Sequence, residues 1–204
     1  MEADPAVPRL SEVLGALPAR LEGETVSIGA LIDRLTPRSY PLIMLLLAFP
    51  NLVPLPAPGL SAIVGLPLAV LTLQMTLGYR EPVLPGFLAR RRISLPQLVA
   101  ACRRAEPWAA RLERLLRPRL VFLLTGPAER VIGLVAMLLS LVILLPIPFG
   151  NAIPALAICL IAVGLLLGDG LTVLAGLVVA ALGVGFVVLF AQAIAGFALG
   201  LIGL

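Results

Sequence analysis

The sequence predicts an all-α integral membrane protein with five to seven membrane-embedded helices, two of its helical hairpins being broken or re-entrant at prolines. Apolar residues make up 60% of the 204 residues and charged residues only 13%, about half the charged share of a soluble domain. The mean hydropathy is +1.11. Between Val131 and Leu204 the only charged side chain is Asp169. Uncharged stretches of this length suit membrane crossings, which need about 20 apolar residues each.

Charge and proline positions divide the chain into five segments. Two polar segments flank the first apolar block, and two apolar segments follow the second polar one. The segments are 1–39, with N-terminal amphipathic helices; 40–79, a first proline-broken membrane hairpin; 80–130, an arginine-rich cytoplasmic or interfacial helical segment; 131–170, a second proline-broken membrane hairpin; and 171–204, C-terminal membrane helices.

The N-terminal segment lacks the basic start and apolar core of a secretory signal peptide. Residues 9–22 and 27–36 instead suit two short amphipathic helices, with Ser27 as the expected N-cap of the second. The apolar residues of this second helix fall on one face, as expected of a helix that lies on a bilayer or packs against the spans. They are Ile28, Leu31, Ile32 and Leu35.

The first apolar block, residues 40–78, is interrupted by four prolines within nine positions, from Pro50 to Pro58. Proline removes a backbone donor and clashes with the preceding turn, so no continuous helix is expected there. We predict a helical hairpin or a re-entrant pair with the proline stretch at its tip. Since irregular backbone in a membrane must be satisfied by protein or water, the tip lies near the far interface or is buried in the fold, and both alternatives remain open.

Residues 80–119 carry ten arginines against three acids. This positive balance places the segment, and with it the N-terminus, in the cytoplasm. Ser94 and Pro96 are expected to begin a helix that Pro107 splits or restarts. We expect an interfacial helix pair with Trp108 at headgroup level and anionic lipids at the arginines. One face is predicted to be apolar: Leu98, Cys102, Ala105, Trp108, Leu112 and Leu115.

The second apolar block contains the runs 131–145 and 152–168, separated by prolines. The remaining 34 residues would form a helix of about 51 Å at 1.5 Å per residue. That length exceeds a bilayer core by too much for tilt alone. We therefore expect two short helices that bend near Gly183 or Gly196.

The two predicted hairpins contain the same sequence pattern. Leu55-Pro56-Ala57-Pro58 and Leu145-Pro146-Ile147-Pro148 lie ninety residues apart, and each is followed about twenty residues later by glycine and a polar residue. Such paired broken segments are typical of repeat-built transporters, many of which have inverted repeats. Recurrent prolines at ordinary hairpin turns are the alternative. The expected helix breaks are Pro56, Pro58, Pro67, Pro146, Pro148 and Pro154.

Several of these motifs resemble the ExoD (exopolysaccharide synthesis) membrane proteins over residues 25–180. The similarity rests on 55–61, 65–68, 74–75, 118–119, 130 with 133, 145–151, 154–155 and 169–170. The resemblance implies a multi-pass bacterial inner-membrane protein linked to exopolysaccharide production and, in some members, to tolerance of alkaline conditions. It carries over no molecular activity and no catalytic residue.

Asp169 is the sharpest candidate for a functional side chain, because a charge within a membrane helix costs about 2.5–3.5 kcal/mol. It is either an ion- or proton-linked carboxylate partnered by Arg130, or a turn residue between Gly168 and Gly170. Uncharged polar residues beside the helix breaks suit ion or anion binding, or simply helix capping. They are Asn51, Ser61, Gln74 and Asn151.

The composition argues against several classes of function. The chain has no histidine and no lysine, no acid pair in its apolar blocks and no phosphate-binding glycine loop, so we expect no enzyme, metal or cofactor. Nucleic acid is not an expected partner. Two hypotheses remain: a small transporter or channel for an ion, a proton-coupled solute or a lipid-linked precursor, and a non-transporting accessory protein that contacts exopolysaccharide synthesis or export components. A homodimer is also expected, because small embedded proteins bury polar helix breaks against a partner.

Overall fold

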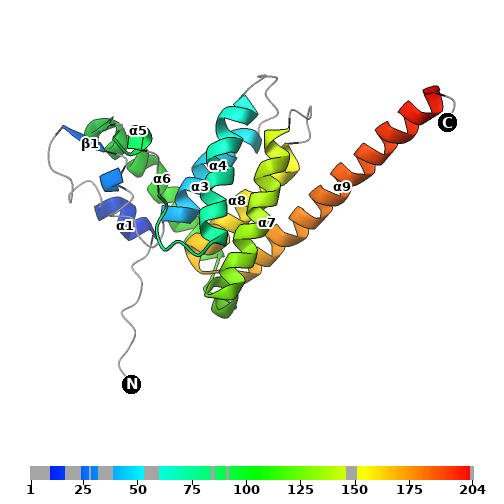
Figure 1. Ribbon diagram of the computed structural model, residues 1–204. Helices are drawn as coiled ribbons and strands as arrows, with labels where there is room; N and C mark the ends of the chain where they lie inside the picture. The colour runs from blue at the N-terminus through cyan, green and yellow to red at the C-terminus, as the bar shows by residue number, and fades with distance from the viewer. Residues whose placement is uncertain are drawn as a thin grey trace.

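The structure is a computed structural model that describes residues 10–16, 24–27, 29–31, 39–52, 60–83, 86–90, 92–145 and 151–202. It is mostly helical, with a helical bundle on one side and a smaller unit of helices and a β-ribbon on the other (Figure 1). The bundle contains α3 (Ser39–Ala48), the 3-10 helix η2 (Phe49–Leu52), α4 (Leu60–Thr76), η3 (Val121–Leu124), α7 (Pro127–Leu144), α8 (Ala152–Leu167) and α9 (Gly170–Ile202).

The smaller unit contains the only strands among the described residues. Its elements are α1 (Leu10–Ala16), β1 (Thr25–Ser27), α5 (Gly86–Ala89), β2 (Arg92–Ser94) and α6 (Leu95–Leu115). The strands β1 and β2 pair antiparallel, with Val26 opposite Ile93. The prediction of an all-α chain is therefore wrong at this ribbon, because three-residue strands are too short to show an alternating pattern. Ser27 caps as predicted, since its hydroxyl accepts from Ala30 N at 3.2 Å.

Each predicted hairpin is present as a pair of packed helices, α3 with α4 and α7 with α8. The most extensive contact joins the hairpins to each other through α4 and α7, and α3 packs on α8. These helices run antiparallel, because Gly65 near the start of α4 touches Leu144 at the end of α7, and Gly133 near the start of α7 touches Thr76 at the end of α4. Both hairpins thus turn at the same end of the bundle (Figure 1), whereas an inverted repeat would place their turns at opposite ends.

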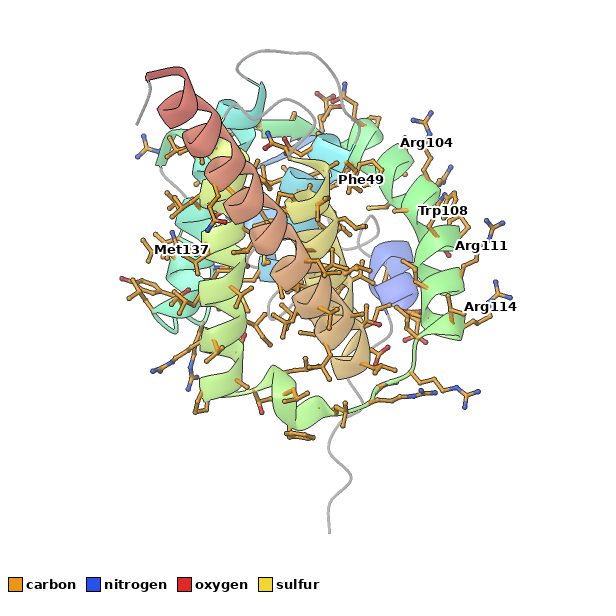
Figure 2. All side chains as sticks on the ribbon, turned by 90° about the vertical axis from the view of Figure 1, so that its right-hand side faces the viewer. Phe49, Arg104, Trp108, Arg111, Arg114 and Met137 are labelled. Carbon is orange, nitrogen blue, oxygen red and sulfur yellow. The ribbon has the colours of Figure 1, made fainter. Side chains whose placement is uncertain are left out.

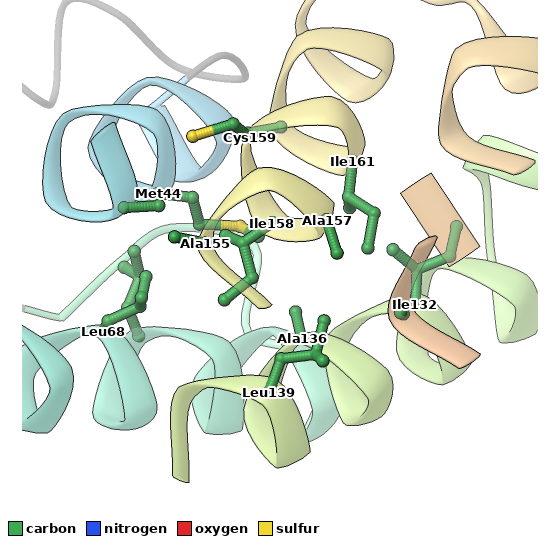
Figure 3. Close-up of a cluster of buried hydrophobic side chains, with 14 of the residues drawn as sticks. Met44, Leu68, Ile132, Ala136, Leu139, Ala155, Ala157, Ile158, Cys159 and Ile161 are labelled. Carbon is green, nitrogen blue, oxygen red and sulfur yellow. The ribbon is translucent and has the colours of Figure 1, made fainter. Parts of the chain in front are cut away.

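The bundle core is built from aliphatic side chains on all four hairpin helices (Figure 3). Met44 on α3, Leu68 on α4, Leu139 on α7 and Ile158 on α8 are each at most 1% exposed. Close packing of such side chains leaves little room for water. The core therefore packs the two hairpins together as one unit.

At three of the predicted breaks, the helix is continuous in the structure. The helix α9 runs unbroken from Gly170 to Ile202 and reaches beyond the bundle (Figure 1), so the expected bend at Gly183 or Gly196 is wrong. A helical glycine costs only about 1 kcal/mol relative to alanine, too little to break a long apolar helix. Pro67 lies inside α4 and Pro107 inside α6, which is one helix and not two. One proline removes one hydrogen bond, and the flanking turns of these helices persist.

Among the residues whose side chains the structure describes, one helix, α7, is long and apolar enough to cross a membrane. Shorter apolar helical segments occupy Ser39–Leu52, Gly65–Thr76 within α4, Ala152–Leu167, and Gly170–Gly185 within α9. The count of five to seven embedded helices and the re-entrant character of the hairpins stay predictions. Pro56, Pro58, Pro146 and Pro148 lie outside the described residues. Pro154 is buried in the first turn of α8, where proline starts a helix rather than breaking it.

Candidate functional site

Two asparagines stand at the end of the bundle where the hairpins turn. Asn51 is 7% exposed, and its Nδ2 donates to Leu47 O at 3.3 Å. Asn151 Nδ2 donates to Ile143 O at 3.2 Å. Each amide therefore satisfies a carbonyl near the end of the preceding helix, one of the groups a helix cannot pair internally. Because η2, which holds Asn51, packs on α8, the two asparagines belong to neighbouring elements.

Several helices also begin or end at this end of the bundle. The helices α4 and α8 begin there, while α3 and α7 run toward it. The positive N-terminal ends of α4 and α8 favour anionic groups. We call this end, with Asn51 and Asn151, the tip end. Ser61 falls in the first turn of α4 at the tip end, but its side chain lies outside the described part.

Asp169 sits at the opposite end of the bundle, in the turn between α8 and α9. It is 3% exposed. Its Oδ1 accepts from Leu171 N at 3.1 Å and its Oδ2 from the Thr172 hydroxyl at 2.8 Å, so the carboxylate caps the start of α9. Gly168 has φ 72°, the left-handed conformation that ends α8. These contacts favour the turn interpretation of Asp169.

The turn at Asp169 is also tied to the chain after α6. Gly170 N donates to Arg119 O at 2.7 Å, and Arg119 and Asp169 form an isolated parallel β-bridge. The predicted partnership of Asp169 with Arg130 stays a prediction. The Arg130 guanidinium lies over Gly78, where a Cβ would meet its Nε at 2.9 Å, and the cap already occupies both carboxylate oxygens.

Gln74 is neither at a helix break nor at the tip end. Its side chain forms two hydrogen bonds with the backbone of Val83, Nε2 to Val83 O at 2.9 Å and Val83 N to Oε1 at 2.7 Å. This clamp holds the chain after α4 against the helix. Tyr40 secures the same stretch, because its hydroxyl donates to Glu81 O at 3.1 Å. The structure therefore gives Gln74 a structural contact and does not bring it to the asparagines.

A buried polar pair in the α4–α7 contact was not predicted. The hydroxyls of Thr72 and Ser140 lie 3.4 Å apart, and both residues are fully buried. Each also binds its own helix, Thr72 through Leu68 O at 2.9 Å and Ser140 through Met137 O at 2.7 Å. Hydroxyls often bond back to the preceding turn in this way, so no sequence signal marks this pair.

The cysteines and acids of the described residues suggest no metal or nucleophile site. No group of three metal-ligating side chains forms among them. Cys102 and Cys159 are separate, buried thiols. Burial raises the pKa of the Cys102 thiol, which keeps this side chain protonated and weakly reactive at neutral pH.

A hollow of about 890 Å³ lies beside the β-ribbon at the start of α6. Polar and apolar residues from β1, β2, α6 and the chain before β1 line it together: Glu24, Thr25, Ser94, Leu95, Pro96, Val99, Ala100, Arg103 and Arg104. None of the residues singled out in the sequence as candidates lines this hollow. It belongs to the smaller unit and not to the bundle.

Comparison with known proteins agrees with the resemblance seen in the sequence motifs. The family model described as "Exopolysaccharide synthesis, ExoD" matches residues 10–189. Protein ExoD of Rhizobium meliloti (strain 1021) is 33% identical over 171 residues, covering 82% of this chain and 71% of the relative. An uncharacterized protein of Synechocystis is 26% identical over 157 residues, covering 76% of this chain and 74% of the relative. No solved structure matches the chain. The chain belongs to the ExoD family, which is linked to exopolysaccharide synthesis.

Proposed function

We propose that this protein is a multi-pass inner-membrane transporter of exopolysaccharide production that moves a lipid-linked precursor. The observation that carries the proposal is the pairing of the two hairpins, which meet through α4 and α7 and through α3 and α8. If the two hairpins exchanged places, α3 with α7 and α4 with α8, the α4–α7 contact would become the α8–α3 contact and the reverse. This symmetry is expected of a duplicated unit. Gly78 and Gly168, ninety residues apart, support the duplication, since both end their hairpins with a positive φ, 80° and 72°.

Outward-facing aliphatic stripes support the membrane location. On α7 the exposed residues recur every three or four positions over the whole helix, and buried residues occupy the other face. A helix in water would present polar side chains on the exposed face, whereas lipid accepts leucine and valine. The stripe of α7 is Val131, Leu134, Leu138 and Leu141, continued by Leu145 just after the helix, and α4 has a similar one at Leu66, Val70 and Leu73, continued by Leu77 just after its end.

The packing of the bundle favours a lipid-linked substrate over an ion or a small solute. An aqueous route needs polar lining, but the interior between the hairpins is filled by Met44, Leu68 and Leu139. A lipid-linked substrate leaves its tail in the bilayer, so only its headgroup requires polar contacts. The tip end offers such contacts to an anionic headgroup, through the amides of Asn51 and Asn151 and the N-termini of α4 and α8.

The membrane location is tested by Leu138→Arg. A charge in the middle of a lipid-facing stripe costs about 2.5–3.5 kcal/mol, so we expect much less protein to be recovered in the carbonate-resistant membrane fraction. Leu138→Phe, an apolar change at the same position, is the control and should insert normally. Normal insertion of Leu138→Arg would show that this face of α7 does not contact lipid.

Transport is tested with the purified full-length protein in liposomes. The probe is a fluorescent short-chain polyprenyl diphosphate bearing one sugar, whose exposure on the outer leaflet is followed by a membrane-impermeant reductant. We expect faster exposure than in protein-free liposomes, and a loss of this gain in Asn51→Leu/Asn151→Leu. Gln74→Leu removes a comparable amide away from the tip end and should transport normally. Equal rates with and without the wild-type protein would refute transport.

A non-transporting accessory role is the second candidate. The close packing of the bundle supports it, because aliphatic side chains fill the described core between the hairpins. An accessory protein would act through contacts with synthesis or export components. Such a protein would show no flux in liposomes, but crosslinking in cells that make exopolysaccharide would recover one of those components. Failure to recover any of them would count against this role.

A further inference from the structure

The outer side of α6 carries a row of exposed arginines around the only tryptophan of the chain. Trp108 is 65% exposed, and Arg111 Cζ lies 5.3 Å from the centre of its ring. Figure 2 shows Arg104, Trp108, Arg111 and Arg114 along α6, pointing away from the bundle. We call these four residues and Arg103 the arginine face. Of the residues predicted to form one apolar face, Trp108 and Leu115 are exposed and Cys102 is buried.

The acids of α6 point to its other side. Glu113 accepts two hydrogen bonds from Ser11 of α1, from its N at 3.1 Å and from its hydroxyl at 2.6 Å. The Glu106 carboxylate lies against Gly15 of the same helix, 3.6 Å from the position a Cβ would take. Glu106 and Glu113 are the only acids of α6, so no acid of this helix lies on the arginine face. Glu24, before β1, lines the hollow beside Arg103 and Arg104 and leaves Arg111 and Arg114 as the arginines of this face farthest from it.

The end of α6 and the chain that follows it expose large apolar side chains, which limits what the arginine face can bind. Leu115 is 78% exposed and Phe122, in η3, is 70% exposed. These residues lead directly into α7, the helix able to cross a membrane. An acidic protein or polysaccharide would pair with the arginines but leave Leu115 and Phe122 in water. A bilayer surface accommodates both, because phosphates meet the guanidinium groups while indole and aliphatic groups enter the headgroup region.

We propose that the arginine face binds the phosphates of anionic lipids at the surface of the membrane that holds α7. The proposal rests on the membrane location proposed above and not on transport. The guanidinium groups pair with lipid phosphates, and Trp108 enters the headgroup layer between them. This contact sets the smaller unit against the membrane surface and holds α6 beside the bundle.

The single tryptophan makes the contact directly measurable. Full-length protein is reconstituted in vesicles of phosphatidylcholine, with or without phosphatidylglycerol, and the quenching of Trp108 by neutral acrylamide is compared. We expect phosphatidylglycerol to reduce quenching roughly twofold and to shift the emission to shorter wavelength, and we expect high salt to reverse both effects. Quenching that is the same in both kinds of vesicle would overturn the proposal.

Two variants that remove the same charge separate the arginine face from net charge. Arg104→Gln/Arg111→Gln/Arg114→Gln should abolish the effect of phosphatidylglycerol, while Arg80→Gln/Arg90→Gln/Arg92→Gln, altered outside α6, should keep it. Each variant is compared with itself in the two lipids, so the loss of the Arg111–Trp108 contact does not confuse the result. An equal loss in both variants would contradict the proposal.

A soluble acidic polymer is the last comparison. Protection of Trp108 by polyglutamate in solution, with no effect of phosphatidylglycerol, would assign the face to an acidic macromolecule and refute lipid binding. None of these measurements depends on flux. A failed transport assay therefore leaves this result standing, and a failed lipid effect leaves the transport assay valid.

Discussion

Replacing Gly133 by leucine is expected to push α4 and α7 apart and so to destabilise the packing of the two hairpins. A Cβ at Gly133 would lie 2.8 Å from Thr76 N and 3.1 Å from Met75 C. These are backbone atoms of α4, which cannot move aside as a flexible side chain can. Overpacking a core typically costs about 1–3 kcal/mol, and we expect the upper part of this range or more because α4 and α7 share the most extensive contact in the bundle.

The measurement is the thermal stability of the detergent-purified protein, followed by the loss of its monodisperse peak in size-exclusion chromatography. Gly185→Leu is the matched control, since no atom lies within 4 Å of the position its Cβ would take. That change should be neutral or slightly stabilising, because leucine is a better helix former than glycine by up to about 1 kcal/mol. If Gly133→Leu and Gly185→Leu have the same melting temperature, the close approach of α4 and α7 at Gly133 does not stabilise the packing of the two hairpins.

The same geometry explains what sequence alone cannot provide about the packing. The chain has 19 glycines, and nothing in their spacing separates Gly133, which allows two helix backbones to touch, from Gly185, which faces open space. Small residues enable such contacts in membrane proteins. Their importance depends on which helix lies opposite, and this depends on the pairing of distant segments. Local patterns carry no information about that pairing.

Helix locations were more predictable than helix ends. Prolines and long apolar runs predicted both hairpins, and the structure confirms them as packed helix pairs. Single prolines and glycines interrupt these helices less than the sequence predicts, because Pro67 and Pro107 lie within continuous helices. A cluster of prolines removes several successive hydrogen bonds, whereas one removes a single bond that the neighbouring turns tolerate. The ribbon of β1 and β2 was missed because each strand has only three residues.

The candidate site was predictable by residue type but not by role. Asn51 and Asn151 lie beside expected helix breaks in the sequence, and the structure places both at the tip end with capping contacts. Gln74 has the same kind of position in the sequence, but its side chain binds the backbone of Val83. An amide forms the same hydrogen bonds in either setting. Only the fold determines which backbone groups are within its reach.

Substitutions of Asp169 are expected to separate its capping role from a role of its charge. Asp169→Ala removes the acceptors of Leu171 N and of the Thr172 hydroxyl, so α9 should lose about 0.5–2 kcal/mol of stability, the usual effect of deleting a cap. Asp169→Asn keeps an acceptor oxygen for Leu171 N and should differ from wild type by a few tenths of a kcal/mol, since asparagine and aspartate cap about equally well.

Exopolysaccharide production in cells also separates the two roles of Asp169. A helix cap and a proton-linked carboxylate predict opposite results for Asp169→Asn. Asparagine cannot exchange a proton in the physiological range, but it caps a helix as aspartate does. We therefore expect cells carrying only Asp169→Asn to produce wild-type amounts of exopolysaccharide, and cells carrying only Asp169→Ala to produce less, in proportion to the folded protein in their membranes. A stable Asp169→Asn protein without exopolysaccharide production would instead show that the buried charge is needed for the activity, although its oxygens are held by α9.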